Sequence, residues 1–151
     1  MDEATQILAL GALHEVETSA LDRTKLDHML GQSFCWATSG SGRDGYVITF
    51  DQNAEYEGVH FGWFKARYPT FVYVDRIVVA THAQGKGIAR AFYKDVMAQA
   101  RRAGHQHLVC EINVQPSNPA SFAFHHAMGF KEIGRAHVGS DKTVSYQALD
   151  L

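Results

Sequence analysis

The chain has 151 residues, of which 46% are hydrophobic and 20% charged, and its net charge at pH 7 is −2. This length and balance predict one domain, residues 1–151, with room for a hydrophobic core. The lack of a basic excess argues against a nucleic-acid partner, and no apolar run is long enough to cross a membrane.

The cysteines and the N-terminus indicate the compartment. Cys35 and Cys110 lie in apolar runs and lack the spacing of a metal site, so two buried, reduced thiols and no bound metal are expected. The apolar segment 7–10 follows Asp2 and Glu3 rather than the basic residues of a signal peptide. The sequence therefore predicts a cytoplasmic protein.

Taken in chain order, the first half of the sequence favours strands. A strand is predicted over residues 6–12, and a short helix then ends at Gly31. Two further strands, 33–38 and 46–50, flank the polar, glycine-rich stretch 39–45, which is typical of a hairpin turn.

Residues 52–69 are predicted to be irregular, and they are rich in aromatic rings such as Tyr56, Trp63 and Tyr68. Long loops of this kind are often functional, so one interpretation is a lid over a binding site. The alternative is that these rings cover a sheet edge or the interface of a homodimer. The sequence leaves both open.

From residue 71 on, strands alternate with helices. The apolar positions of the helix that follows the first of these strands recur every four residues, and Gly104 ends it. The predicted elements are strands at 71–80, 107–114, 131–138 and 144–149, and helices at 88–103 and after Asn118. This order predicts an α/β (α+β) fold: a mixed, largely antiparallel sheet of about six to seven strands with helices on both faces.

The junction at residues 78–91 is the most informative part of the chain. An apolar run ends, Gly85 and Gly87 follow in a short polar loop, and a helix begins at once. Glycines allow a close approach to a ligand, and the first N–H groups of a helix bind anions. A P-loop is excluded because Gly87 is followed by Ile88, and Arg90 stands where a dinucleotide-binding loop needs a small residue.

The sequence Gln84-Gly85-Lys86-Gly87-Ile88-Ala89 resembles the pyrophosphate loop of the GNAT family of N-acetyltransferases. Downstream, Asn118-Pro119-Ala120-Ser121 and the Gly129-Phe130 pair resemble the second motif of that family, in the same order and at the usual separation. The segments 73–79 and 110–113 resemble more particularly a bacterial branch of it. Together the motifs cover residues 72 to 138, about half of the chain.

The resemblance implies that acetyl-coenzyme A (acetyl-CoA) is the co-substrate. The strand before the loop would splay from the strand after the helix, so that its main chain pairs with the pantetheine arm and one N–H polarises the thioester carbonyl. The residues implied in binding are Ile77, Val78, Val79, Gln84, Gly85, Lys86, Gly87, Ile88, Ala89, Arg90, Asn118 and Ser121. Asn118 before Pro119 also predicts a helix N-cap, and the two roles are compatible.

His125 occupies a position at which members of the family often carry a tyrosine that protonates the departing thiolate. An imidazole can donate a proton at neutral pH, so the role could survive the exchange. The alternative is that His125 is structural, with water as the acid. A metal site is disfavoured, since His125 and His126 point about 100° apart on a helix.

Asp75 and Glu111 are the candidates for the general base, because acidic residues inside apolar strands are costly unless they are paired or functional. Strand alternation predicts that Tyr73, Asp75, Ile77 and Val79 share one face. The two carboxylates could abstract the proton of an amine or only attract a cationic one. Asp75 is adjacent to Arg76, and an ion pair with some other basic group is the structural alternative for Asp75.

The function predicted from the sequence is transfer of an acetyl group from acetyl-CoA to a small-molecule or peptide amine by direct attack in a ternary complex. Cys110 as a covalent acyl carrier is discounted, because the sequence shows no activating base for it. The alternative from another class is a coenzyme A-binding module without turnover.

Overall fold

The computed structural model describes residues 2–13, 21–115 and 117–151. The helices are α1 (Glu3–Leu13), α2 (Arg23–Gln32), α3 (Val59–Lys65), α4 (Ile88–Arg102) and α5 (Pro119–Met128), with short 3₁₀ turns at Gly40–Gly42 and Thr81–Ala83. The strands are β1 (Trp36–Ser39), β2 (Gly45–Asp51), β3 (Val72–Val79), β4 (His107–Gln115), β5 (Lys131–Val138) and β6 (Lys142–Asp150).

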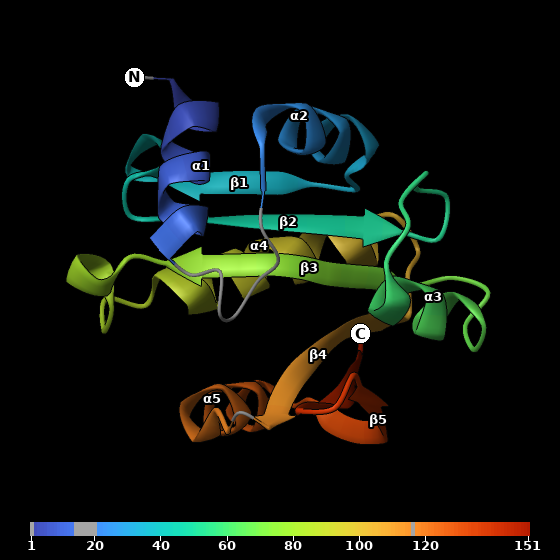
Figure 1. Cartoon of the computed structure of the whole chain (residues 1–151). Helices are drawn as coiled ribbons and strands as arrows, with labels where there is room; N and C mark the ends of the chain where they lie inside the picture. Colours follow the sequence, from blue (N-terminus) through green and yellow to red (C-terminus); the bar gives the residue numbers. More distant parts are fainter. Residues whose placement is uncertain (1, 14–20, 116) are drawn as a thin grey trace.

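The described strands form one sheet in the order β1-β2-β3-β4-β6-β5, in which only the β3–β4 pair is parallel. Helices cover both faces (Figure 1). One buried cluster joins the sheet to α1, α2 and α3, and a second joins the other face to α4, with α5 packed against it. The predicted fold class is therefore confirmed, with six strands.

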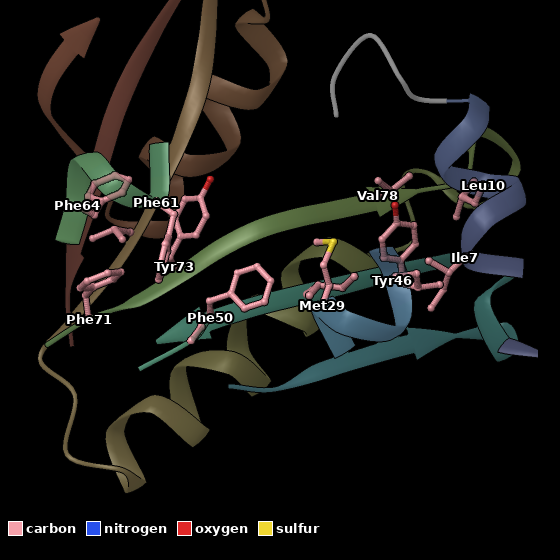
Figure 2. Close-up of a cluster of buried hydrophobic side chains, with 14 of the residues drawn as sticks. Ile7, Leu10, Met29, Tyr46, Phe50, Phe61, Phe64, Phe71, Tyr73 and Val78 are labelled. Atoms are coloured by element: carbon pink, nitrogen blue, oxygen red, sulfur yellow. The ribbon is translucent and has the colours of Figure 1, made fainter. Parts of the chain in front are cut away.

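The predicted strand over residues 6–12 is wrong, because α1 occupies this segment. Ile7 and Leu10 are buried on one side of the helix, three residues apart, whereas Leu13 is 80% exposed. Ile7 and Leu10 pack in the same core as Tyr46 and Val78 (Figure 2). A short apolar run does not distinguish a strand from a buried helix turn, and here packing on the sheet decided the outcome.

The aromatic segment is not irregular throughout, because its second half forms α3. Phe61 and Phe64, three residues apart, are buried against Phe71, which directly precedes β3, and Tyr73 within it (Figure 2). Trp63 stacks on Tyr146 with ring centroids 4.0 Å apart. These rings therefore cover a face of the sheet over β3 and β6 rather than one of its edges.

β3 and β4 separate soon after they start. They pair only through Val72 with Leu108 and Tyr73 with Val109, and beyond these pairs β4 leans away from β3 (Figure 1). The gap widens towards the ends of both strands, which lead into the glycine loop and into α5. The splay that the family resemblance implied is present.

A β-bulge in β3 changes which face its residues present. Ile48 pairs with Arg76 and Thr49 with Val74, which leaves Asp75 as an extra residue without a partner on β2. Strict alternation is lost at this point. Tyr73 packs with α1–α3 whereas Ile77 packs with the cluster of α4, so the prediction that Tyr73, Asp75, Ile77 and Val79 share one face is wrong.

Candidate functional site

The glycine loop after β3 ends in the exposed N-terminus of α4. Gly85 and Gly87 have φ values of 78° and 79°, a left-handed backbone that other residues rarely adopt. The first helical bond runs from the Ala91 N–H to the Gly87 carbonyl at 3.0 Å, so the amides of Ile88, Ala89 and Arg90 precede it. With open space around both glycines, this loop can receive an anion.

A cavity of about 180 Å³ fills the gap between the separated parts of β3 and β4. The structure brings together here many of the residues that the sequence singled out, with α5 forming one wall. Its lining is Val74, Asp75, Arg76, Ile77, Tyr93, Cys110, Glu111, Ile112, Asn113, Asn118, Ser121, His125 and Lys142. We refer to it as the wedge cavity.

The other predicted site residues lie outside the wedge cavity lining. Residues 84–87 form the loop after β3, and residues 88–90 form the first turn of α4. The side chains of Val78 and Val79 pack in the cluster of α1–α3, so only their main chain is available to a ligand in the gap.

A second cavity, of about 280 Å³, opens on the side of α3, and we refer to it as the α3 cavity. It shares Asp75, Arg76, Glu111 and Lys142 with the wedge cavity. The residues that only the α3 cavity has are Lys25, Tyr56, Glu57, Gly58, Val59, His60, Phe61, Tyr73 and Val138. Two reactants entering from opposite sides of the sheet would therefore meet at the two carboxyl groups.

Glu111 is half-buried, and the Tyr73 hydroxyl donates a hydrogen bond of 2.7 Å to its Oε2. Burial raises the pKa of Glu111 to about 8; the neighbouring Asp75 charge adds to this and the Tyr73 bond opposes it. A carboxyl group whose pKa lies near neutrality is poised to accept a proton from a substrate.

Asp75 accepts a 2.9 Å hydrogen bond from the Tyr56 hydroxyl, and its other oxygen lies 3.3 Å from Arg76 Nε. Burial raises the pKa of Asp75, while Arg76 opposes this. Asp75 therefore forms an ion pair with the adjacent Arg76, whereas the structural alternative from the sequence was a pair with some other basic group. An ion pair does not remove Asp75 from the site, because it borders both cavities.

His125 is buried and bonded through both ring nitrogens. Its Nδ1 lies 2.7 Å from the Ser121 carbonyl oxygen, and its Nε2 lies 2.6 Å from the hydroxyl oxygen of Tyr93. Burial lowers the pKa of His125. Sequence reasoning missed Tyr93, because 32 positions separate it from His125 and no local pattern connects them.

Asn118 caps α5 as predicted, since its Oδ1 accepts the Ser121 N–H at 3.3 Å and Pro119 opens the helix. Cys110 is buried, and burial raises the pKa of its thiol well above the usual value, so it stays protonated. This agrees with discounting Cys110 as a nucleophile. Cys35, expected to be buried, is only half-buried.

Within the described ranges, 2–13, 21–115 and 117–151, none of the helices is both long and apolar enough to cross a membrane. Three or more His, Cys, Asp or Glu side chains suited to holding a metal ion do not come together in these ranges.

The sequence is similar to one protein family and to one curated acetyltransferase. The model of the Acetyltransferase (GNAT) family matches residues 10–130. The L-2,4-diaminobutyric acid acetyltransferase of Wolinella succinogenes is 28% identical over 100 residues, which are 66% of this chain and 58% of that protein. The chain thus spans little more than half the length of this curated relative.

Solved structures share the fold at low identity. Ard1 from Thermoplasma volcanium superposes with a TM-score of 0.76 at 10% identity, over 99% of this chain and 91% of that one. The ribosomal-protein-S18-alanine N-acetyltransferase from Escherichia coli gives 0.66 at 15%, over 97% and 86%. An aminoglycoside 6'-N-acetyltransferase complexed with coenzyme A gives 0.71 at 12%, over 97% and 89%.

Proposed function

Because the chain belongs to the GNAT family of acetyltransferases, we propose that it transfers an acetyl group from acetyl-CoA to an amine by direct attack in a ternary complex. The observation that carries the proposal is the meeting of two cavities at Glu111 and Asp75, in the gap between β3 and β4. One cavity would admit the thioester and the other the amine.

The loop and the wedge cavity would hold acetyl-CoA. The amides at the start of α4 suit the negative pyrophosphate, and Lys86 and Arg90 add positive charge. The main chain of Ile77, Val78 and Val79 would run along the pantetheine arm, since β4 leaves this side of β3 unpaired. In the loop and the first turn of α4, the other residues that would contact the coenzyme are Gln84, Gly85, Gly87, Ile88 and Ala89. On α5 they are Asn118 and Ser121.

The chemistry needs a base, an electrostatic partner for the thioester carbonyl, and an acid. Glu111 would accept the amine proton, since its pKa of about 8 matches that task. Asp75 would attract the cationic amine into place. A main-chain N–H of the segment 77–79 would stabilise the developing oxyanion. His125, on the wall of the wedge cavity, would be the source of the proton for the departing sulfur.

The acceptor would enter through the α3 cavity, whose volume of about 280 Å³ and mixed charges suit a small polar amine. The relative from Wolinella succinogenes is named for L-2,4-diaminobutyric acid, so this diamino acid is the first acceptor to test. A peptide with an N-terminal alanine is the second, because one structural neighbour is an alanine N-acetyltransferase. No observation favours the inactive coenzyme A-binding module.

Several further expectations belong to this proposal. Cys35 and Cys110 are free thiols, which supports a cytoplasmic site of action. The chain would act as one domain over residues 1–151 without a nucleic-acid or membrane partner. Pairing into a homodimer is tested by analytical ultracentrifugation of the purified chain.

Isothermal titration calorimetry with acetyl-CoA, with NAD and ATP as controls, tests the co-substrate. Release of free thiol with each acceptor then tests the transfer. Gly87→Trp should abolish acetyl-CoA binding and leave the circular dichroism spectrum unchanged, because the bulky ring would fill the open space at the loop. Equal affinity of this variant and the parent would remove the loop from the site, and no binding by the parent would refute the proposal.

A further inference from the structure

The hydrogen bonds of His125 leave no ring nitrogen free for a substrate. A carbonyl oxygen only accepts, so the 2.7 Å contact with the Ser121 carbonyl requires a hydrogen on Nδ1. In the neutral imidazole Nε2 is then an acceptor, and the Tyr93 hydroxyl donates to it at 2.6 Å. A proton held by His125 can leave towards the cavity only through the oxygen of Tyr93.

The imidazole is also fixed in place by aromatic rings. Phe124, Phe130 and Tyr93 surround it edge-on, with ring centroids 5.2–5.3 Å away. A ring held in this way does not rotate easily out of its two hydrogen bonds, since interiors are close-packed. The phenol of Tyr93, by contrast, lines the wedge cavity and comes from α4, on the opposite side of His125 from Ser121.

We propose that Tyr93 is the group that meets the sulfur of the coenzyme, and that His125 supplies its proton through the Tyr93 hydroxyl. This inference rests on the proposed acetyl transfer and deepens it. The phenol that members of the family often carry at the position of His125 would here be provided by α4, with His125 behind it.

In this transfer, each bond to hydrogen that breaks is matched by one that forms. Burial lowers the pKa of His125, so the charged imidazole is the minor form from which the transfer starts. In that form both nitrogens carry hydrogen, so Nδ1–H keeps its bond to Ser121 and Nε2–H donates to the Tyr93 oxygen. When the carbon–sulfur bond breaks, its electron pair stays on sulfur. Tyr93 gives its phenolic proton to the sulfur, forming the S–H bond, and takes the Nε2 proton of His125. The negative and positive charges cancel, and the phenol is regenerated. The proton that Glu111 takes from the amine passes to solvent, and a solvent proton returns to His125 through the Tyr93 hydroxyl, so the cycle consumes no net proton.

The hydrogen bonds of the structure match the arrangement after this transfer, with Tyr93 donating to a neutral His125. Tyr93 has the two in-plane sites on its oxygen that such a relay needs, one to donate and one to accept. A hydroxyl in this position would distinguish a coenzyme that has a sulfur from one that lacks it, even without turnover.

The test uses the full chain and two variants, Tyr93→Phe and the control Tyr68→Phe. The Tyr68 ring packs on His107, 4.7 Å away between centroids, and lies outside the wedge cavity lining. Tyr93→Phe should lower kcat roughly 100-fold, the usual contribution of general acid catalysis, with an unchanged KM for acetyl-CoA. Tyr68→Phe should behave as the parent.

A binding measurement is independent of turnover. The parent should bind coenzyme A more tightly than desulfo-coenzyme A, and Tyr93→Phe should lose this preference. Parent-like kcat and parent-like preference in Tyr93→Phe would overturn the inference. Failure of the proposed transferase function has a different signature: the parent would release no thiol, and the binding preference would still decide whether Tyr93 meets the sulfur.

His125→Gln separates proton supply from mere orientation. The glutamine amide can still bond to Tyr93 but has no proton to give. We expect kcat to fall as far as in Tyr93→Phe, and the double variant to lose nothing more, because the two residues act in series. Parent-like kcat in His125→Gln would overturn the relay.

Discussion

The raised pKa of Glu111 should be visible as an unusual pH dependence of stability. Glu111→Gln keeps the shape of the side chain and an oxygen that can accept the Tyr73 hydrogen bond, but it removes the titration. The folded protein holds the Glu111 proton up to a pKa of about 8, whereas the unfolded chain releases it near 4.5. Between these values the folded state binds one more proton than the unfolded state.

This difference in bound protons determines the sign and the size of the pH effect on the free energy of unfolding. Stability falls with rising pH wherever the folded state holds the extra proton, by about 1.4 kcal/mol per pH unit. Over the interval from 4.5 to about 8 the loss is about 5 kcal/mol. The free energy of unfolding of Glu111→Gln relative to the parent should therefore rise by about 5 kcal/mol from pH 4 to pH 9.

Urea unfolding followed by tryptophan fluorescence at a series of pH values measures this difference. Glu132→Gln is the matched control, because hydrogen bonds from Arg135 lower the pKa of Glu132 and its contribution has the opposite sign. If the parent and Glu111→Gln show the same pH dependence, Glu111 is not held protonated, and its assignment as a base poised near neutrality is wrong. Activity of the parent should rise towards pH 8.

The remaining predictions concern acceptor binding and packing. Asp75→Asn should raise KM for the amine and leave the Kd of acetyl-CoA unchanged; an equal loss in both would assign Asp75 a structural role. Asn118→Ala should lower the free energy of unfolding by about 1 kcal/mol, because α5 loses its cap, and unchanged urea unfolding would contradict this. Phe64→Ala should cost about 4 kcal/mol in the same assay, since it empties a fully buried site under α3; a loss below 1 kcal/mol would mean that α3 repacks easily.

Local patterns predicted the second half of the chain well. The glycine loop, the start of α4 after Gly87 and the Asn118 cap each depend on residues within a few positions of one another, so the sequence contains the whole signal. The secondary structure of the first half was predicted less well. The run around Ile7 is too short to reveal its period, and α3 is a short helix whose stability comes from burying Phe61 and Phe64 against the sheet.

Prediction of the candidate site was also limited by contacts between segments that are distant in the sequence. The cost of an acidic residue inside an apolar strand drew attention to Asp75 and Glu111. Alternation along β3 failed, because the bulge at Asp75 depends on pairing with β2, which no stretch of β3 encodes alone. The contact between Tyr93 and His125 joins α4 to α5, and the pKa of Glu111 depends on burial under elements from both halves of the chain. These properties arise only after folding.

The separation of β3 from β4 also has a consequence for how the molecule holds together. The sheet consists of two three-strand halves, β1-β2-β3 and β4-β6-β5, joined by two residue pairs near Val72 and Tyr73. A ligand bonded to the main chain of β3 in this gap would act as a missing piece of strand. Its binding would then couple the two halves mechanically, so amide hydrogen exchange along both β3 and β4 would slow together when acetyl-CoA binds.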